Sequence, residues 1–243
     1  MEQLKKIFSF MMLLALVSAG VLSGCNSNST STKKPVIKNI FSYHVGYIEK
    51  NVLKNSYKIT ENANELEIQA RHFPEQWIPS PSFPGVPPKP PKYIPEEYIQ
   101  KKAYLAFDFS NLTSIDPSNI QSITLKIYRT YKTIYVDNDN DIYGKVQAIF
   151  CDYQIPLKDA DWNCIITATP LIMLQENLEK QTWFYLDLTE QIKERIKSGN
   201  SKIQIHLKRE INDIKDPTFN EYMDGFENKN NELKPRLEVK LFE

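Results

Sequence analysis

The sequence predicts an all-β fold: an antiparallel, jelly-roll-like β-sandwich with one short helix and one long proline-rich loop. Apolar and polar residues alternate with a period of two in many short segments, which is the pattern of strands with one buried face. The 243 residues include 13 tyrosines and 12 phenylalanines but only 7 glycines, a composition typical of strands. Strands that follow one another without intervening helices pair antiparallel, and a sandwich buries one face of each.

The first 24 residues have the pattern of a signal peptide. Lys5 and Lys6 precede an apolar run over residues 7–21, which is too short to span a bilayer and ends at Leu22-Ser23-Gly24-Cys25. This ending resembles the lipobox of bacterial lipoproteins, which implies cleavage before Cys25 and acylation of that cysteine. Two or more acyl chains anchor a protein stably. We therefore expect an extracytoplasmic lipoprotein anchored to the cell membrane, or to the outer membrane if the host has two.

The mature chain is expected to hold a tether and one domain. Residues 25–36 are small and polar and predict a flexible linker. The β-sandwich domain is expected over residues 37–243, with the first clear strand at 65–72. Residues 73–99 carry a dense set of prolines, so we expect an extended surface excursion without strand or helix.

Strand patterns return after the prolines. The predicted strands cover residues 102–110, 120–128, 144–151, 184–188, 203–207 and 237–241. One helix interrupts them. Thr189 is its expected N-cap, Ile192 and Ile196 share its buried face, and Gly199 ends it.

Several of these segments resemble a known family in their order along the chain. They are Ala103–Ser110 (AYLAFDFS), Ile120–Tyr128 (IQSITLKIY), Asp161-Trp162 and Pro235–Val239 (PRLEV). They resemble the DNRLRE domain family, jelly-roll sandwiches similar to carbohydrate-binding modules. The resemblance covers about residues 41–242 and implies a non-catalytic domain that binds polysaccharide.

Three aromatic residues in and beside the proline-rich segment are the candidate carbohydrate site. Trp77, Tyr93 and Tyr98 could stack on pyranose rings, because the apolar face of a sugar packs on an aromatic ring. The alternative is that these rings pack the loop onto the sandwich. For Trp162 we expect core packing.

An acidic loop is the candidate metal site. Asp137, Asp139 and Asp141 alternate in one loop and could direct oxygen ligands at calcium. Ile142 and Ala148 stand where an EF-hand needs glycine and glutamate. The favoured interpretation is therefore a solvated hairpin turn, with calcium as the alternative.

Two cysteines remain once Cys25 is acylated. Cys151 and Cys164 are either a disulfide or two buried thiols, and both alternatives stay open in an oxidising compartment. Neither C-x-x-C spacing nor a histidine nearby in the sequence accompanies them, which argues against a metal site.

The net charge and the motifs of the sequence limit the classes of function that we expect. The formal net charge is +0, which argues against nucleic acid as a partner. The sequence contains no nucleophile elbow, no phosphate-binding loop and no paired histidine ligands, so we do not expect an enzyme. The sequence thus predicts a membrane-anchored lipoprotein that binds cell-surface or extracellular polysaccharide. The alternatives are a structural lipoprotein that docks another envelope protein, and a glycan-processing enzyme.

Overall fold

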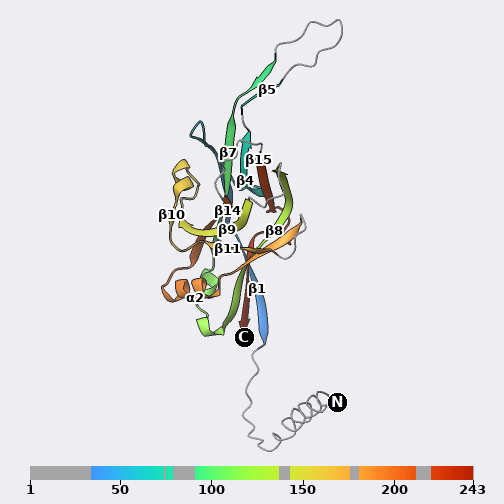
Figure 1. The fold of residues 1–243 in the computed structure, drawn as a ribbon. Helices are drawn as coiled ribbons and strands as arrows, with labels where there is room; N and C mark the ends of the chain where they lie inside the picture. Colours follow the sequence, from blue (N-terminus) through green and yellow to red (C-terminus); the bar gives the residue numbers. More distant parts are fainter. Residues whose placement is uncertain are drawn as a thin grey trace, which may run out of the picture. The chain divides into compact units, whose positions relative to one another are not determined.

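A computed structural model describes residues 34–73, 75–78, 91–136, 143–175, 181–211 and 220–242. They belong to one compact unit, residues 34–243 (Figure 1). Its strands are β1 Pro35–Phe41, β2 His44–Asn51, β3 Ser56–Glu61, β4 Glu65–Phe73, β5 Gln76–Ile78, β6 Lys92–Ile94, β7 Glu97–Asp108, β8 Ile120–Val136, β9 Tyr143–Asp152, β10 Ile165–Ile166, β11 Leu171–Ile172, β12 Leu174–Gln175, β13 Thr182–Asp187, β14 Lys202–Ile211, β15 Asn220–Glu227 and β16 Arg236–Phe242. The helices are α2 Thr189–Lys197 and the 3-10 turns η1 Ser110–Leu112, η2 Pro117–Asn119 and η3 Asp159–Asn163. The predicted all-β sandwich with one short helix is confirmed.

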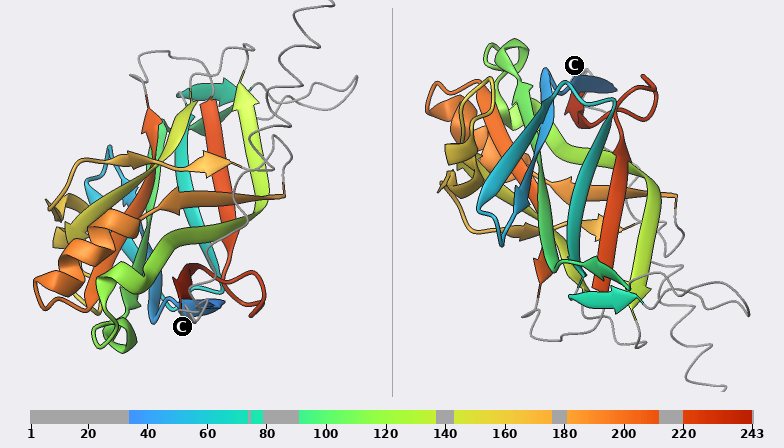
Figure 2. Two further views of the ribbon diagram at one scale, coloured as in Figure 1. Left: turned by 90° about the horizontal axis from the view of Figure 1, so that it is seen from below. Right: turned by 90° about the horizontal axis from the view of Figure 1, so that it is seen from above.

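The ladders between these strands are antiparallel and almost encircle the core (Figure 2). The 17-residue strand β8 bends, so that its first half pairs with β13 and β16 and its second half pairs with β15. From β15 the ladders continue through β4, β7 and β14 to β9. The short strands β11 and β12 then connect β9 back to β13, joined by the buried Met173. Because β8 belongs to both halves, the two layers form one continuous, flattened sheet.

Two core clusters lie on opposite faces of the same strands. Along β7, Leu105 and Phe107 point into the main core between the layers, whereas Tyr104 and Ala106 point outward. The outward residues form a second cluster that is covered by the segment between β9 and β10. Its buried members are Ile48, Tyr104, Ala106, Cys151, Tyr153, Leu157 and Trp162. This second cluster makes η3 part of the packed structure.

The helix α2 differs from the prediction only at its start. Leu188, one residue earlier than expected, is its N-cap, because Asp187 accepts the backbone N–H of Thr189 at 2.9 Å. The Thr189 hydroxyl instead accepts the backbone N–H of Ile123 at 2.9 Å, which ties the helix to β8. Ile192 and Ile196 are buried as predicted, and Gly199 ends the helix with a φ of 76°.

The prediction that residues 73–99 contain no strand is wrong. The strands β5 and β6 form a two-stranded sheet in which Trp77 lies opposite Tyr93, and β7 begins at Glu97. Prolines flank β6 at positions 91 and 95 and do not interrupt it, so its ladder loses no donor. Three strands, β1 to β3, also precede the first strand expected from the sequence.

Candidate functional site

A pocket of about 290 Å³ lies where β7 changes its neighbour from β14 to β4. The ladder with β14 ends at Ala103, and the ladder with β4 begins at Lys101, so β4 and β14 diverge here. The lining residues are Gln69, Ala70, Gln100, Lys101, Lys102, Trp162, Lys208 and Arg209. Four of the eight are cationic and none is acidic.

Two of the four cations are neutralised by carboxylates beside the pocket. The Lys101 ammonium lies 2.6 Å from Glu67 and 3.2 Å from Glu49. The Arg209 guanidinium lies 3.2 Å from the buried Asp224. These two cations therefore contribute little net charge to the pocket.

Lys102 and Lys208 differ from these two cations. In the part of the chain that the structure describes, no carboxylate forms an ion pair with either. The Lys102 ammonium donates to the Trp162 carbonyl at 2.7 Å and lies 4.3 Å from the Trp162 ring centroid. Burial lowers the pKa of Lys102 to about 8. The nearby Cys164 raises this pKa, whereas the like charge of Lys208 lowers it. An anion between the two lysines would relieve this repulsion.

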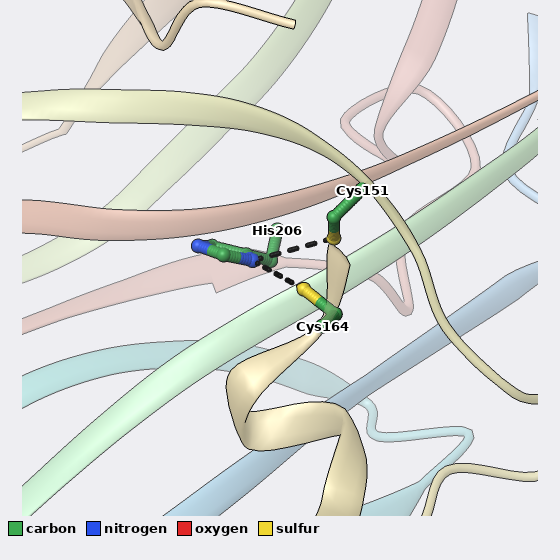
Figure 3. Close-up of side chains that lie close together, drawn as sticks. All are labelled: Cys151, Cys164 and His206. Atoms are coloured by element: carbon green, nitrogen blue, oxygen red, sulfur yellow. Dashed lines mark hydrogen bonds between the residues drawn. The ribbon is translucent and has the colours of Figure 1, made fainter. Parts of the chain in front are cut away.

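Beside Lys102, and close enough to influence its pKa, lies a cluster of two cysteines and one histidine. Figure 3 shows these three side chains pointing toward one another. Cys151 is on β9, Cys164 follows η3 directly, and His206 is on β14. The His206 Nδ1 atom lies 3.4 Å from the Cys151 sulfur and 3.2 Å from the Cys164 sulfur. Cys151 and His206 are buried, while Cys164 is half-buried.

The carboxylate and backbone of Asp161 hold η3, and with it Cys164, in place. The carboxylate accepts the backbone N–H groups of Gln154 at 3.0 Å and Lys158 at 2.7 Å. The Asp161 carbonyl accepts the Tyr104 hydroxyl at 3.0 Å and the backbone N–H of Cys164 at 3.1 Å. The cluster therefore sits on three elements that are fixed independently of it.

The pKa values of the two thiols in the cluster shift in opposite directions. The hydrogen bond with Cys151 is the largest influence on the Cys164 thiol and lowers its pKa. Burial raises this pKa, and the hydrogen bond with His206 lowers it. The hydrogen bond between the two thiols, together with burial, raises the pKa of Cys151. Burial lowers the pKa of His206. Of the two thiols, Cys164 therefore loses its proton more readily than Cys151.

Both cysteines are free in the structure, and their sulfurs lie within 4.8 Å of each other. A disulfide between them stays a prediction. The sequence has no histidine near the pair, but in the structure β14 brings His206 to it from 42 residues beyond Cys164. The sequence signal that points to His206 is its position between Ile205 and Leu207. Because these two residues face the main core, His206 lies on the opposite face of β14.

The predicted aromatic site is divided by the structure. The Tyr98 hydroxyl accepts a hydrogen bond from the side-chain amide of Gln100, so Tyr98 contacts a residue that lines the pocket. Tyr93 lies on β6 and is 45% exposed. The backbone of Trp77 pairs with Tyr93, but its side chain lies outside the described residues. Trp162 is buried, as expected.

Other candidates fall outside the described residues. These are the signal peptide, Cys25, and the loop with Asp137, Asp139 and Asp141, so acylation and calcium binding stay predictions. Among the described helices, none is long and apolar enough to cross a membrane.

Comparison with known proteins assigns no family. No family model matches the chain, and no curated protein matches it. The resemblance to the DNRLRE family therefore rests on the motifs quoted above.

Proposed function

We propose that the chain is a membrane-anchored surface lipoprotein whose β-sandwich binds an acidic polysaccharide without cleaving it. The observation that carries the proposal is that one pocket holds two cations, Lys102 and Lys208, for which the described part of the chain offers no carboxylate ion pair. The whole chain is charge-balanced, so this positive charge is local. A carboxylate or sulfate group on a sugar would form charge-assisted hydrogen bonds here, which are about twice as strong as neutral ones.

The surroundings of the pocket fit an extended ligand. Gln100 lines the pocket and contacts Tyr98, and β6 with the exposed Tyr93 precedes this part of β7. A polysaccharide that places an acidic group between the lysines could continue over Tyr98, whose ring offers an apolar surface for the next sugar. This arrangement extends the aromatic site predicted from the sequence.

The pocket favours binding over glycan processing. Glycoside hydrolysis ordinarily needs a pair of carboxyl groups flanking the bond, and none of the pocket-lining residues is acidic. The nearby carboxylates of Glu67 and Asp224 are engaged by Lys101 and Arg209.

Docking of another envelope protein is the second candidate. The observation that favours it is the short strand β10, whose two residues are both exposed and apolar, with Ile165 74% and Ile166 57% exposed. Exposed apolar patches of this kind mark interaction surfaces.

Calorimetric titration of the chain from Lys34 onward, which contains both core clusters, tests the proposal. The titrants are uronate-containing, sulfated and neutral oligosaccharides of equal length. We expect acidic ligands to bind and the neutral one to bind at least about tenfold more weakly. Lys208→Gln should weaken acidic binding several-fold, whereas Lys240→Gln, the same change at an exposed position on β16, should not. Equal binding of neutral ligands, or no effect of Lys208→Gln, would contradict the proposal.

A further inference from the structure

We propose that Cys151, Cys164 and His206 form a binding site for one thiophilic closed-shell metal ion, Zn²⁺ or Cu⁺. The three candidate ligand atoms converge on one point from β9, the end of η3 and β14 (Figure 3). None of these three residues lines the polysaccharide pocket, and Lys102 lies beside both sites.

The distances between the ligand atoms fit such an ion. With metal–sulfur bonds of about 2.3 Å and metal–nitrogen bonds of about 2.0 Å, tetrahedral geometry puts sulfur and nitrogen about 3.5 Å apart. The observed distances from His206 Nδ1 are 3.4 Å to the Cys151 sulfur and 3.2 Å to the Cys164 sulfur. Both sulfur–nitrogen distances therefore match a bound ion to within a few tenths of an ångström, and the two sulfurs lie within 4.8 Å of each other.

The donor set selects the kind of ion. Two thiolates and one imidazole are soft and borderline ligands, which suit Zn²⁺ and Cu⁺ and not the hard cations Ca²⁺ and Mg²⁺. No carboxylate belongs to the cluster within the described residues. Three protein ligands satisfy Cu⁺, whereas Zn²⁺ would take water as a fourth ligand on the side where Cys164 is half-buried.

The site is held in place before any ion arrives. His206 and Cys151 project from paired strands, with His206 opposite Ile149 in the β14–β9 ladder. Cys164 is fixed through its backbone N–H to the Asp161 carbonyl. Lys102 lies close enough to both cysteines to affect their charges, so its ammonium offsets the negative charge of two thiolates. A preorganised site of this kind loses little conformational entropy on binding.

The test is metal titration of the reduced protein after removal of bound metal with a chelator. Zn²⁺ is titrated in competition with a chromophoric chelator, and Cu⁺ is titrated without oxygen in competition with a Cu⁺-specific chelator. We expect one equivalent of at least one ion to bind, with two protons released if both thiols are protonated beforehand and fewer if Cys164 is already a thiolate. Substitution with Co²⁺ should give a thiolate-to-metal charge-transfer band.

Cys164→Ser and His206→Gln should each weaken binding by more than about 100-fold. His72→Gln, a histidine change outside the cluster, should leave binding unchanged. Circular dichroism measures whether each variant retains the β fold. If the variant of the buried His206 does not fold, Cys164→Ser alone tests the contribution of the cluster to metal binding. The proposal is overturned if the reduced protein binds neither ion, if the cluster variants bind as well as the unchanged protein, or if protein isolated from cells without reductant contains a Cys151–Cys164 disulfide.

Discussion

At the scale of single residues, Lys102 connects the pocket to the thiol cluster, and its protonation controls the proposed binding. Burial lowers its pKa to about 8, and only the protonated ammonium attracts an anion. A bound anion favours the charged form, so binding takes up protons around this pH. Affinity should therefore be highest below pH 8 and fall as the pH rises above it.

This pH dependence can be measured by titrating an acidic oligosaccharide between about pH 6.5 and 9.5, a range in which sugar carboxylates stay ionised. Lys102→Gln should bind more weakly at pH 7 and show a flatter profile. An unchanged profile in the variant would mean that another group titrates.

A second residue-scale prediction concerns Asp224, which is fully buried between two arginines. Its carboxylate lies 3.5 Å from the Arg129 guanidinium and 3.2 Å from Arg209. Asp224→Asn removes the carboxylate charge that both guanidinium groups contact, and breaking a buried pair in this way costs about 3–5 kcal/mol of unfolding free energy. Urea unfolding measures the loss.

The matched control is Glu190→Gln, which removes an exposed i,i+3 pair with Lys193. It should change the unfolding free energy by less than about 1 kcal/mol. If the two variants are equally stable, the buried cluster does not hold β8, β14 and β15 together.

At the same scale, the sequence identified the two cysteines but not their partner. Spacing along one strand places residues on one face, but it does not determine which strands become neighbours. Cys164 meets His206 only because η3 folds back over the outer face of β14 and β9. Lys102 and Lys208 were missed for the same reason, since their proximity depends on the β7–β14 ladder.

At the scale of elements, the aromatic residues around β6 and β7 offer the next prediction. Tyr93 is exposed on β6, and truncation to alanine should change the unfolding free energy by less than about 1 kcal/mol. Tyr98 is half-buried, with its ring edge-on to His72, so Tyr98→Ala should cost more. Both changes should weaken acidic oligosaccharide binding if the ligand runs along this edge.

Thermal melts paired with binding isotherms separate stability from affinity in these variants. Tyr43→Ala, at a position 48% exposed, is the control for loss of a surface ring. Normal binding by the Tyr93 and Tyr98 variants would confine the ligand to the lysine pocket.

Strands with one fully buried face were predictable, and others were not. Alternation identified β7, β8, β14 and β16, because each presents a regular apolar face to the main core. It missed β2, where His44, Val45 and Gly46 are buried in succession between two clusters, so apolar and polar positions do not alternate. It missed β5 and β6 because each has only three residues.

At the scale of the whole molecule, the sheet almost closes on itself and carries the pocket on an outer face, where a ligand can reach it without unfolding the core. A membrane anchor would keep this surface near the cell envelope. Cys25→Ala should abolish lipid labelling and leave the protein unprocessed or released. Mass spectrometry of the mature amino terminus decides the matter, since an unmodified terminus at any other residue rules out the lipoprotein prediction.

The most direct test of the central claim is to map which lysines an acidic polysaccharide covers. Limited acylation with and without an acidic oligosaccharide, followed by mass spectrometry, reports the reactivity of each lysine. The account predicts that the ligand protects Lys102 and Lys208 but not the exposed Lys240, and that a neutral oligosaccharide protects none of them. Binding of the acidic ligand without protection of Lys102 and Lys208 would contradict it.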